Sequence, residues 1–238
     1  MNDRPEELAH LERIAQHSLY AAGINSTTVR YSFEIFRRHM RGQTLLELGP
    51  AEGVMTERLD SLGMAMTLVD GSPSFCDDLR RRFPAATVIT GLFEDVQVEG
   101  RFDNIILGHV LEHVEDPVTI LRRARGWLAP GGRILAAVPN ARSLHRQAAV
   151  ILGLLDFEEQ LNDLDRHHGH RRVYNPETFR RDFLQAGLQL AIFGGYWIKP
   201  LSNSQIEEDW SDEMVWAFMR LGERYPDIGA ELYVVATA

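Results

Sequence analysis

The stretch that decides the fold of this chain is residues 44–53, Thr-Leu-Leu-Glu-Leu-Gly-Pro-Ala-Glu-Gly. Its first half is a short apolar run that ends at Gly49, as buried parallel strands commonly do. The periodicity after the turn predicts a helix over about residues 52–62. Gly49 and Gly53 stand four residues apart around that turn, so the backbone there can come close to a ligand. The stretch therefore predicts a strand, a ligand-binding loop at Glu47–Gly53 and a helix.

Outward from this stretch, short apolar runs alternate with segments of helical periodicity. We expect further strands at residues 66–69, 87–89, 102–107, 133–138, 188–197 and 231–237, and helices at 73–83, 117–128, 141–155, 158–164, 176–186 and 205–224. Ser72 and Asp116 are expected to cap the two helices that begin with proline. Two more helices fit the first forty residues, the second one after the cap candidates Asn25 and Ser26. Strands that alternate with helices predict an α/β fold with a largely parallel sheet covered on both faces.

Length and composition favour one enzyme-sized domain. The 238 residues show no linker, so we expect a single domain, 1–238, with a helical cap at 1–40, a cofactor-binding core at 41–140 and lid helices with the last two strands at 141–238. A net charge of −9 disfavours a nucleic-acid partner. The longest apolar run, residues 148–155, is too short to cross a membrane. A single cysteine, Cys76, fits a cytoplasmic location, and a homo-oligomer stays open.

Polar residues at the strand ends point to a nucleoside ligand. Ligands of open α/β sheets bind beyond the carboxyl ends of the strands, and the second strand ends at Asp70, a carboxylate able to accept hydrogen bonds from both ribose hydroxyls. The glycine spacing is not the Gly-x-Gly-x-x-Gly of nicotinamide-binding loops. Glu52 would also repel a pyrophosphate, whereas a cationic sulfonium tolerates it. These features favour S-adenosylmethionine over a nicotinamide cofactor.

The motifs together resemble those of class I S-adenosylmethionine-dependent methyltransferases. The matching segments, in the order of that family, are residues 44–53, 68–70, 91–95, 102–106 and 128–133. Leu111-Glu112-His113-Val114 resembles a signature of the subgroup that includes ubiquinone-biosynthesis and natural-product O-methyltransferases. The resemblance implies a Rossmann-like, mostly parallel sheet of seven strands. Its last strand would be antiparallel between the fifth and sixth, and a helical lid formed by residues 1–40, 141–165 and 205–224 would cover the acceptor.

The resemblance also implies which residues bind S-adenosylmethionine and its product S-adenosylhomocysteine. The methionine end would lie against Glu47, Gly49, Pro50 and Gly53, the ribose against Asp70, Gly71 and Ser72, the adenine against Phe93 and Glu94, and the sulfonium near Gly108 and His109. One residue departs from the family pattern, which often has glycine where this chain has Ala51. We expect its methyl group to shift the loop slightly without abolishing binding.

The acceptor side is expected to be rich in histidine. His109, His113 and His170 are the candidate catalytic residues, because an imidazole can remove a proton from a hydroxyl near neutral pH. Tyr31, Arg171 and Tyr174 are the candidate substrate contacts. No metal is expected, since the histidines at 167–170 come without a cysteine or a paired carboxylate. The sequence thus predicts methyl transfer to a small molecule, O-methylation preferred. N-methylation of an amine, amino sugar or peptide stays open, as do, less favoured, a nicotinamide-dependent oxidoreductase and a non-catalytic cofactor-binding partner.

Overall fold

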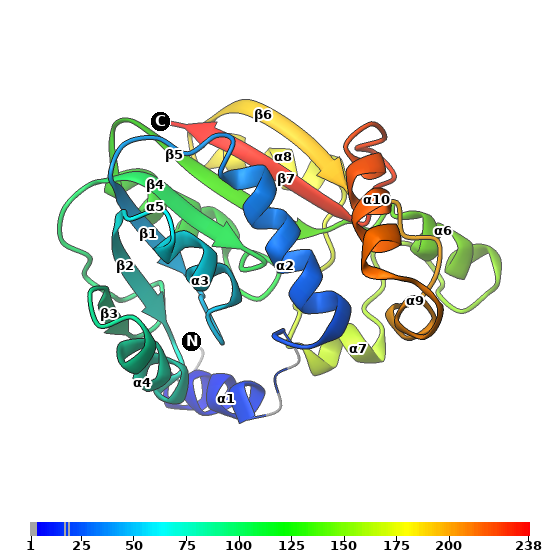
Figure 1. Cartoon of the computed structure of the whole chain (residues 1–238), viewed down its shortest axis with the longest axis horizontal. Helices are drawn as coiled ribbons and strands as arrows, with labels where there is room; N and C mark the ends of the chain where they lie inside the picture. The colour runs from blue at the N-terminus through cyan, green and yellow to red at the C-terminus, as the bar shows by residue number, and fades with distance from the viewer. Residues whose placement is uncertain (1–3, 17, 19) are drawn as a thin grey trace.

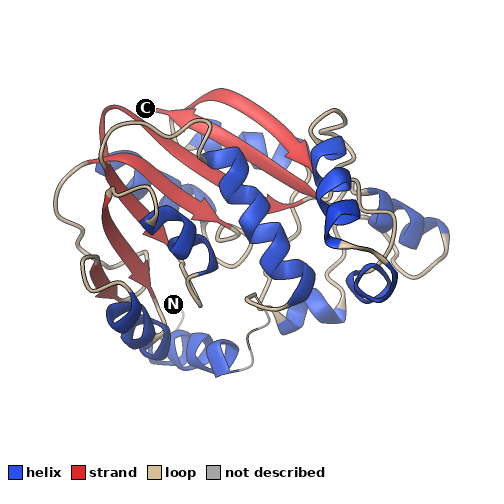
Figure 2. Ribbon diagram, in the orientation of Figure 1, coloured by secondary structure: helices blue, strands red, loops and turns tan. Residues whose placement is uncertain are grey.

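The protein is built around one twisted sheet, seen in a computed structural model that describes residues 4–16, 18 and 20–238. The seven strands lie in the order β3-β2-β1-β4-β5-β7-β6 (Figures 1 and 2). β1 to β5 are parallel, and β7 is antiparallel to both of its neighbours, β5 and β6. The strands are β1 Thr44–Leu48, β2 Ala65–Asp70, β3 Thr87–Thr90, β4 Phe102–Gly108, β5 Leu128–Pro139, β6 Gln189–Tyr196 and β7 Glu231–Thr237. The predicted fold class and the insertion of the last strand are confirmed.

Helices cover both faces of the sheet because alternate residues of its central strands are buried on opposite sides. Leu46 and Leu48 of β1 belong to one core with helices α5 and α8, and Leu45 belongs to the other with α2, α3, α4 and α10. The helices are α1 Arg4–Gln16, α2 Gly23–Phe36, α3 Val54–Asp60, α4 Pro73–Arg82, α5 Pro117–Trp127, α6 Leu144–Ile151, α7 Asp163–His167, α8 Pro176–Gln185, α9 Asn203–Asp209 and α10 Asp212–Gly222.

Local capping explains where several helices begin. The Ser72 and Asp116 side chains accept hydrogen bonds from backbone N–H groups of α4 and α5, as predicted. α2 instead begins at Gly23, so the prediction of Asn25 and Ser26 as caps was wrong. The helix expected at 158–164 begins only at Asp163, where Asn162 forms a capping box. The one helix expected at 205–224 is two, because Trp210 is extended and Ser211 caps a new helix.

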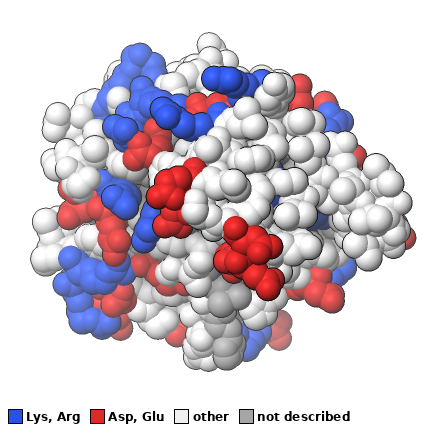
Figure 3. All heavy atoms as spheres, turned by 45° about the vertical axis from the view of Figure 1, so that its right-hand side comes forward, with Lys and Arg blue, Asp and Glu red and all other residues white. Residues whose placement is uncertain are grey.

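Two properties of the surface bear on partners. No helix in the described part of the chain is long and apolar enough to cross a membrane. On the face drawn in Figure 3, Lys and Arg side chains lie among Asp and Glu rather than in one continuous basic field. Duplex nucleic acid is usually bound by such a field.

Candidate active site

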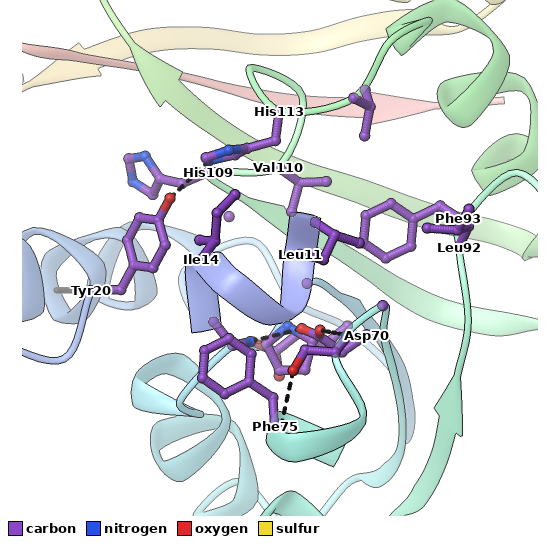
Figure 4. A pocket seen from close by; sticks show the side chains of 18 of the residues that line it. Leu11, Ile14, Tyr20, Asp70, Phe75, Leu92, Phe93, His109, Val110 and His113 are labelled. Atoms are coloured by element: carbon purple, nitrogen blue, oxygen red, sulfur yellow. Dashed lines mark hydrogen bonds between the residues drawn. The ribbon is translucent and has the colours of Figure 1, made fainter. Parts of the chain in front are cut away.

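A large cavity of about 1110 Å³ lies at the carboxyl ends of β1, β2 and β4. This is the edge where open α/β sheets bind ligands. Pockets for drug-sized ligands measure roughly 300–1,000 Å³, so a cavity of this size has room for a nucleoside cofactor and a small acceptor together. Figure 4 shows Asp70 and Phe75 at one end and His109 and His113 at the other, with Leu11 and Ile14 between them.

Every residue predicted to bind the cofactor, except Gly53, lines this cavity. The lining residues from that set are Glu47, Gly49, Pro50, Asp70, Gly71, Ser72, Phe93, Glu94, Gly108 and His109. Gly53 lies behind the loop with a φ of 76° and precedes the first residue of α3. A side chain on Gly53 would lie within 3.0 Å of Leu79. Its role is therefore to shape the turn through its backbone conformation.

The loop after β1 leaves room for a ligand because Gly49 has no side chain. Its φ is 68°, its N–H donates to the Val69 carbonyl at 2.9 Å, and a Cβ there would lie 2.9 Å from Val110 Cγ2 and 3.6 Å from Phe93. A side chain would thus fill the space that separates these two cavity walls. Ala51 in the same loop has a φ of 48°, the left-handed conformation that glycine adopts more readily.

Asp70 is the carboxylate at the end of β2 and is only 7% exposed. Its two oxygens accept hydrogen bonds from the N–H of Ala51 at 3.1 Å and the N–H of Ser72 at 2.8 Å. Burial outweighs these bonds and raises the pKa of Asp70 to about 6. The two backbone bonds fix the carboxyl group at the cavity wall, and each oxygen keeps a lone pair for ligand hydroxyls.

Glu47 is a second buried carboxylate at the same end of the cavity. It is 3% exposed and accepts a hydrogen bond from Thr56 Oγ1 at 2.7 Å. Burial raises the pKa of Glu47 to about 7, helped by the charge of Asp70 and opposed by the Thr56 hydrogen bond. Among the described residues neither carboxyl group has a basic partner, which favours a cationic ligand because a positive charge would stabilise their ionised forms. The loop and its carboxylates therefore fit the sulfonium and ammonium groups of S-adenosylmethionine.

His109 at the other end lies between two carboxylates. Its Nδ1 is 3.5 Å from Glu112 Oε1 and 3.8 Å from Glu231 Oε2, and its Nε2 is 3.5 Å from Ser32 Oγ. Burial disfavours the charged imidazole, but Glu112 and Glu231 outweigh that effect, so the pKa of His109 is raised. The His109 side chain is 13% exposed and reaches the cavity wall with a φ of 59°.

His113, the histidine of the Leu-Glu-His-Val signature, also lines the cavity and joins it to the segment before α8. Its Nε2 lies 3.1 Å from the Tyr20 hydroxyl, which donates to the His168 carbonyl at 3.1 Å. Burial lowers the pKa of His113 to about 4. His170 packs edge-on against it with ring centroids 4.8 Å apart but does not itself line the cavity. The neutral state of His113 follows from this environment.

Of the three candidate substrate contacts, only Arg171 lines the cavity. It donates to the His113 carbonyl at 2.7 Å and pairs with Glu7 of α1 at 2.8 Å. Tyr31 and Tyr174 lie outside the cavity wall, each 1% exposed and each bonded to a carboxylate through its hydroxyl. The partners are Glu223 at 2.5 Å for Tyr31 and Asp182 at 3.1 Å for Tyr174. Both tyrosines pack in the core of this structure, and their predicted contact with substrate stays a prediction.

The cover of the cavity comes mainly from α1. Leu11 and Ile14 line the cavity, Leu11 packs on Gly71, and Glu12 accepts a hydrogen bond from Ser72 Oγ at 2.7 Å. The apolar stripe of the first helix is the sequence signal that marks these residues. α6, α9 and α10 contribute no residue to the described cavity wall, because α9 and α10 pack on α2 and on β6 instead. The predicted lid is therefore smaller than expected and lies at the N-terminal end.

Comparisons with known proteins identify the family. A family model described as a methyltransferase domain matches residues 22–191. The ubiquinone biosynthesis O-methyltransferase of Methylobacterium sp. strain 4-46 is 30% identical over 220 residues, 83% of this chain and 87% of that protein.

Two solved structures share the fold. The S-adenosylmethionine-dependent methyltransferase of Thermotoga maritima has a TM-score of 0.66 and 16% identity, and the match covers 97% of this chain and 99% of that one. The glycopeptide N-methyltransferase MtfA, in complex with S-adenosylmethionine, has a TM-score of 0.58 and 14% identity, with 88% and 93% of the two chains covered. The chain belongs to the class I S-adenosylmethionine-dependent methyltransferases, enzymes that convert this cofactor to S-adenosylhomocysteine.

Proposed function

We propose that this methyltransferase methylates an oxygen atom of a small-molecule acceptor and that residues 1–238 act as one domain. The observation that carries the proposal is His109, held at the cavity wall between Glu112 and Glu231. A hydroxyl group must lose its proton as it is methylated, and a histidine with a raised pKa can accept that proton. Similarity to ubiquinone biosynthesis O-methyltransferases supports the same choice.

The cofactor end of the cavity has a separate task, which is to hold and orient. Asp70 would accept hydrogen bonds from the ribose hydroxyls, and Glu47 would stabilise the positive charge at the methionine end. Phe93 and Glu94 would contact the adenine, one by packing and one through polar groups. When bound, S-adenosylmethionine supplies an electrophilic methyl group. Alignment of that group with the acceptor accounts for most of the expected rate gain.

At the histidine end, the chain would position the acceptor and hold its proton. His109 would take the hydroxyl proton, and Glu112 and Glu231 would stabilise the resulting imidazolium and fix the ring. Arg171 would attract an acidic group on the acceptor, within the limits set by its ion pair with Glu7. Leu11, Ile14 and Val110 would exclude water from this part of the cavity.

The experiment compares matched acceptors that differ only in the nucleophilic atom. Purified protein is incubated with S-adenosylmethionine and with pairs of phenols and the corresponding anilines, and with catechols and alcohols. Formation of S-adenosylhomocysteine and of a methylated product is followed by mass spectrometry. We expect turnover of the oxygen member of a pair. Turnover of amines alone would replace this proposal with N-methylation, and binding of S-adenosylhomocysteine without turnover of any acceptor would favour a non-catalytic partner.

A further inference from the structure

Lys199 is the only lysine among the 25 lysine and arginine residues of the chain. It follows the end of β6, on the side where α10 packs against that strand (Figure 1). Lysine offers a compact ammonium group on a flexible stem, whereas the guanidinium of arginine is larger and planar. A single lysine in a chain that otherwise uses arginine indicates that this position needs a compact positive charge.

The surroundings of Lys199 shield its ammonium group from water. The residue is partly buried, and its Nζ lies 5.0 Å from the centroid of the Trp197 ring, a cation–π distance. Among the described residues, no carboxylate comes within the 4.0 Å of a direct ion pair with Nζ. Burial lowers the pKa of Lys199 to about 8. The charges that act on it, from the strongest to the weakest, are Glu231, Asp165, Arg146 and Glu207.

Glu231, the first residue of β7, links Lys199 to the acceptor end of the cavity. In the sheet it pairs with Tyr196 of β6, three residues before Lys199. Its side chain is 10% exposed, and its Oε2 lies 3.8 Å from His109 Nδ1. That oxygen accepts no hydrogen bond from any residue that the structure describes. A buried carboxylate with so few partners keeps its charge only where nearby cations stabilise it.

The ionisation of Glu231 depends on two cations. Burial raises the pKa of Glu231 to about 7, and the positive charges of His109 and Lys199 oppose that rise. A base must be neutral before it accepts a proton, so at that moment His109 offers no charge and Lys199 is the stronger remaining cation. The other charges that act on Glu231 are Glu112 and His170, and the titratable groups that face His109 are Glu112, His113 and Glu231.

We propose that Lys199 is a positioning residue of the active site, because its ammonium group keeps Glu231 negatively charged and so lets Glu231 stabilise the imidazolium that forms on His109. The inference rests on the proposed function, in which His109 takes the proton of the acceptor hydroxyl. Neither Lys199 nor Glu231 gains or loses a proton in that step. Lys199 acts on Glu231 without touching it, since charges inside a protein are screened much less than charges in water.

The test follows the protonation of His109 by NMR, in protein without acceptor. Histidine ring carbons are labelled with ¹³C, and the His109 signal is assigned by its loss in His109→Asn. In Lys199→Met the midpoint of the His109 titration should fall by about 0.5 or more on the pH scale, because Glu231 then takes up a proton and supports the imidazolium less. Arg224→Met removes the same charge from an exposed residue and should leave the midpoint unchanged.

The same substitution in Glu231→Gln shows whether Lys199 acts through Glu231. Glutamine has no charge for Lys199 to maintain, so Lys199→Met should no longer lower the His109 midpoint in this background. A fall of equal size in both backgrounds would overturn the proposal, as would an unchanged midpoint in Lys199→Met alone. Because no acceptor is present, these outcomes do not depend on which atom the enzyme methylates.

A second measurement uses Lys199 itself and does not require that Lys199→Met folds. With ¹³C-labelled lysine, the single Cε signal of the chain reports the titration of Lys199. Glu231→Gln should lower its midpoint, since it removes the strongest of the negative charges that stabilise the ammonium group. Binding of S-adenosylhomocysteine checks that each variant is folded. An equal lysine midpoint in wild type and Glu231→Gln would show that the two groups are not coupled and would end the proposal.

Discussion

The two ends of the cavity differ in how far apart in the sequence their residues lie. At the cofactor end, Glu47 bonds to a residue nine positions away, and Asp70 bonds to Ala51, nineteen positions away. At the histidine end, Tyr20 bonds to His113 and His168 across 93 and 148 positions, and Ser32 meets His109 across 77. The first end is one strand-turn-helix unit and its neighbour, whereas the second is assembled by the whole fold.

This difference separates holding the cofactor from acting on the acceptor. The local end offers fixed carboxylates and a glycine turn, which are enough to bind a cationic nucleoside. The assembled end holds titratable groups in mutual contact, and such clusters are typical of catalytic sites. Changes at the first end should therefore alter affinity and stability, and changes at the second should alter turnover.

The largest expected effect is at the histidine end, with His109→Asn. Asparagine tolerates the φ of 59° better than most residues but cannot accept a proton near neutral pH. We expect kcat to fall by about 10²–10⁴-fold, the usual contribution of a general base, with the affinity for S-adenosylhomocysteine unchanged. Steady-state kinetics and calorimetry measure the two quantities, and the exposed His167→Asn serves as control. An unaltered kcat would mean that His109 is not the base.

The second effect concerns Glu47 and the pH dependence of stability. Its pKa rises from an ordinary 4.5 to about 7 on folding. Below pH 4.5 the carboxyl is protonated in both states and costs nothing. Between pH 4.5 and 7 the unfolded state ionises while the native carboxyl stays protonated, so stability is lost across this range, and above pH 7 the loss is complete. The shift corresponds to roughly 3 kcal/mol.

Glu47→Gln keeps an acceptor for the Thr56 hydroxyl and removes this ionisation. We expect the variant to gain up to about 3 kcal/mol over the wild type at pH 8 and little at pH 4.5. Urea denaturation at both pH values measures the free energy of unfolding, with Glu99→Gln on the surface as the matched control. If the free energy of unfolding of Glu47→Gln changed with pH as much as that of the wild type, Glu47 would not be the group whose titration lowers stability.

The third effect is on affinity at the cofactor end. Asp70→Ala should weaken binding of S-adenosylhomocysteine by about 1–3 kcal/mol, the range for loss of a charged hydrogen-bond partner. Asp60→Ala, an exposed change on α3, should leave it unchanged. Comparing S-adenosylhomocysteine with its 2′-deoxy analogue isolates the ribose contact. The wild type should prefer the ribose form, and Asp70→Ala should lose that preference. If both proteins preferred the ribose form equally, the ribose hydroxyls would not bind at Asp70.

The same contrast explains what the sequence predicted and what it did not. The sheet and the cofactor loop follow from local signals, namely apolar runs, glycines in a tight turn and a carboxylate at a strand end. The burial of Tyr31 and Tyr174 could not be predicted, because an aromatic residue near a site looks the same in sequence whether it packs in the core or faces a cavity. The meeting of His109 with Glu231 could not be predicted either, since it depends on contacts between distant segments.

The smallest expected effect is at Ala51, the residue that departs from the family pattern. A φ of 48° places an L-residue in the left-handed region, at a cost of about 1–2 kcal/mol. Glycine removes that cost but loses roughly 0.4–1 kcal/mol through the greater freedom of the unfolded chain. Ala51→Gly should therefore stabilise the protein by up to about 1.5 kcal/mol.

The control for Ala51→Gly is the same substitution at Ala85, an exposed residue whose φ is not positive. At Ala85 there is no strain to remove, and only the greater freedom of the unfolded chain changes. Ala85→Gly should therefore destabilise the protein by roughly 0.4–1 kcal/mol. Opposite signs in urea denaturation would show that the loop at Ala51 stores strain. If both substitutions destabilise equally, Ala51 carries no strain in the native loop. The bond from its N–H to Asp70 would then account for its backbone conformation.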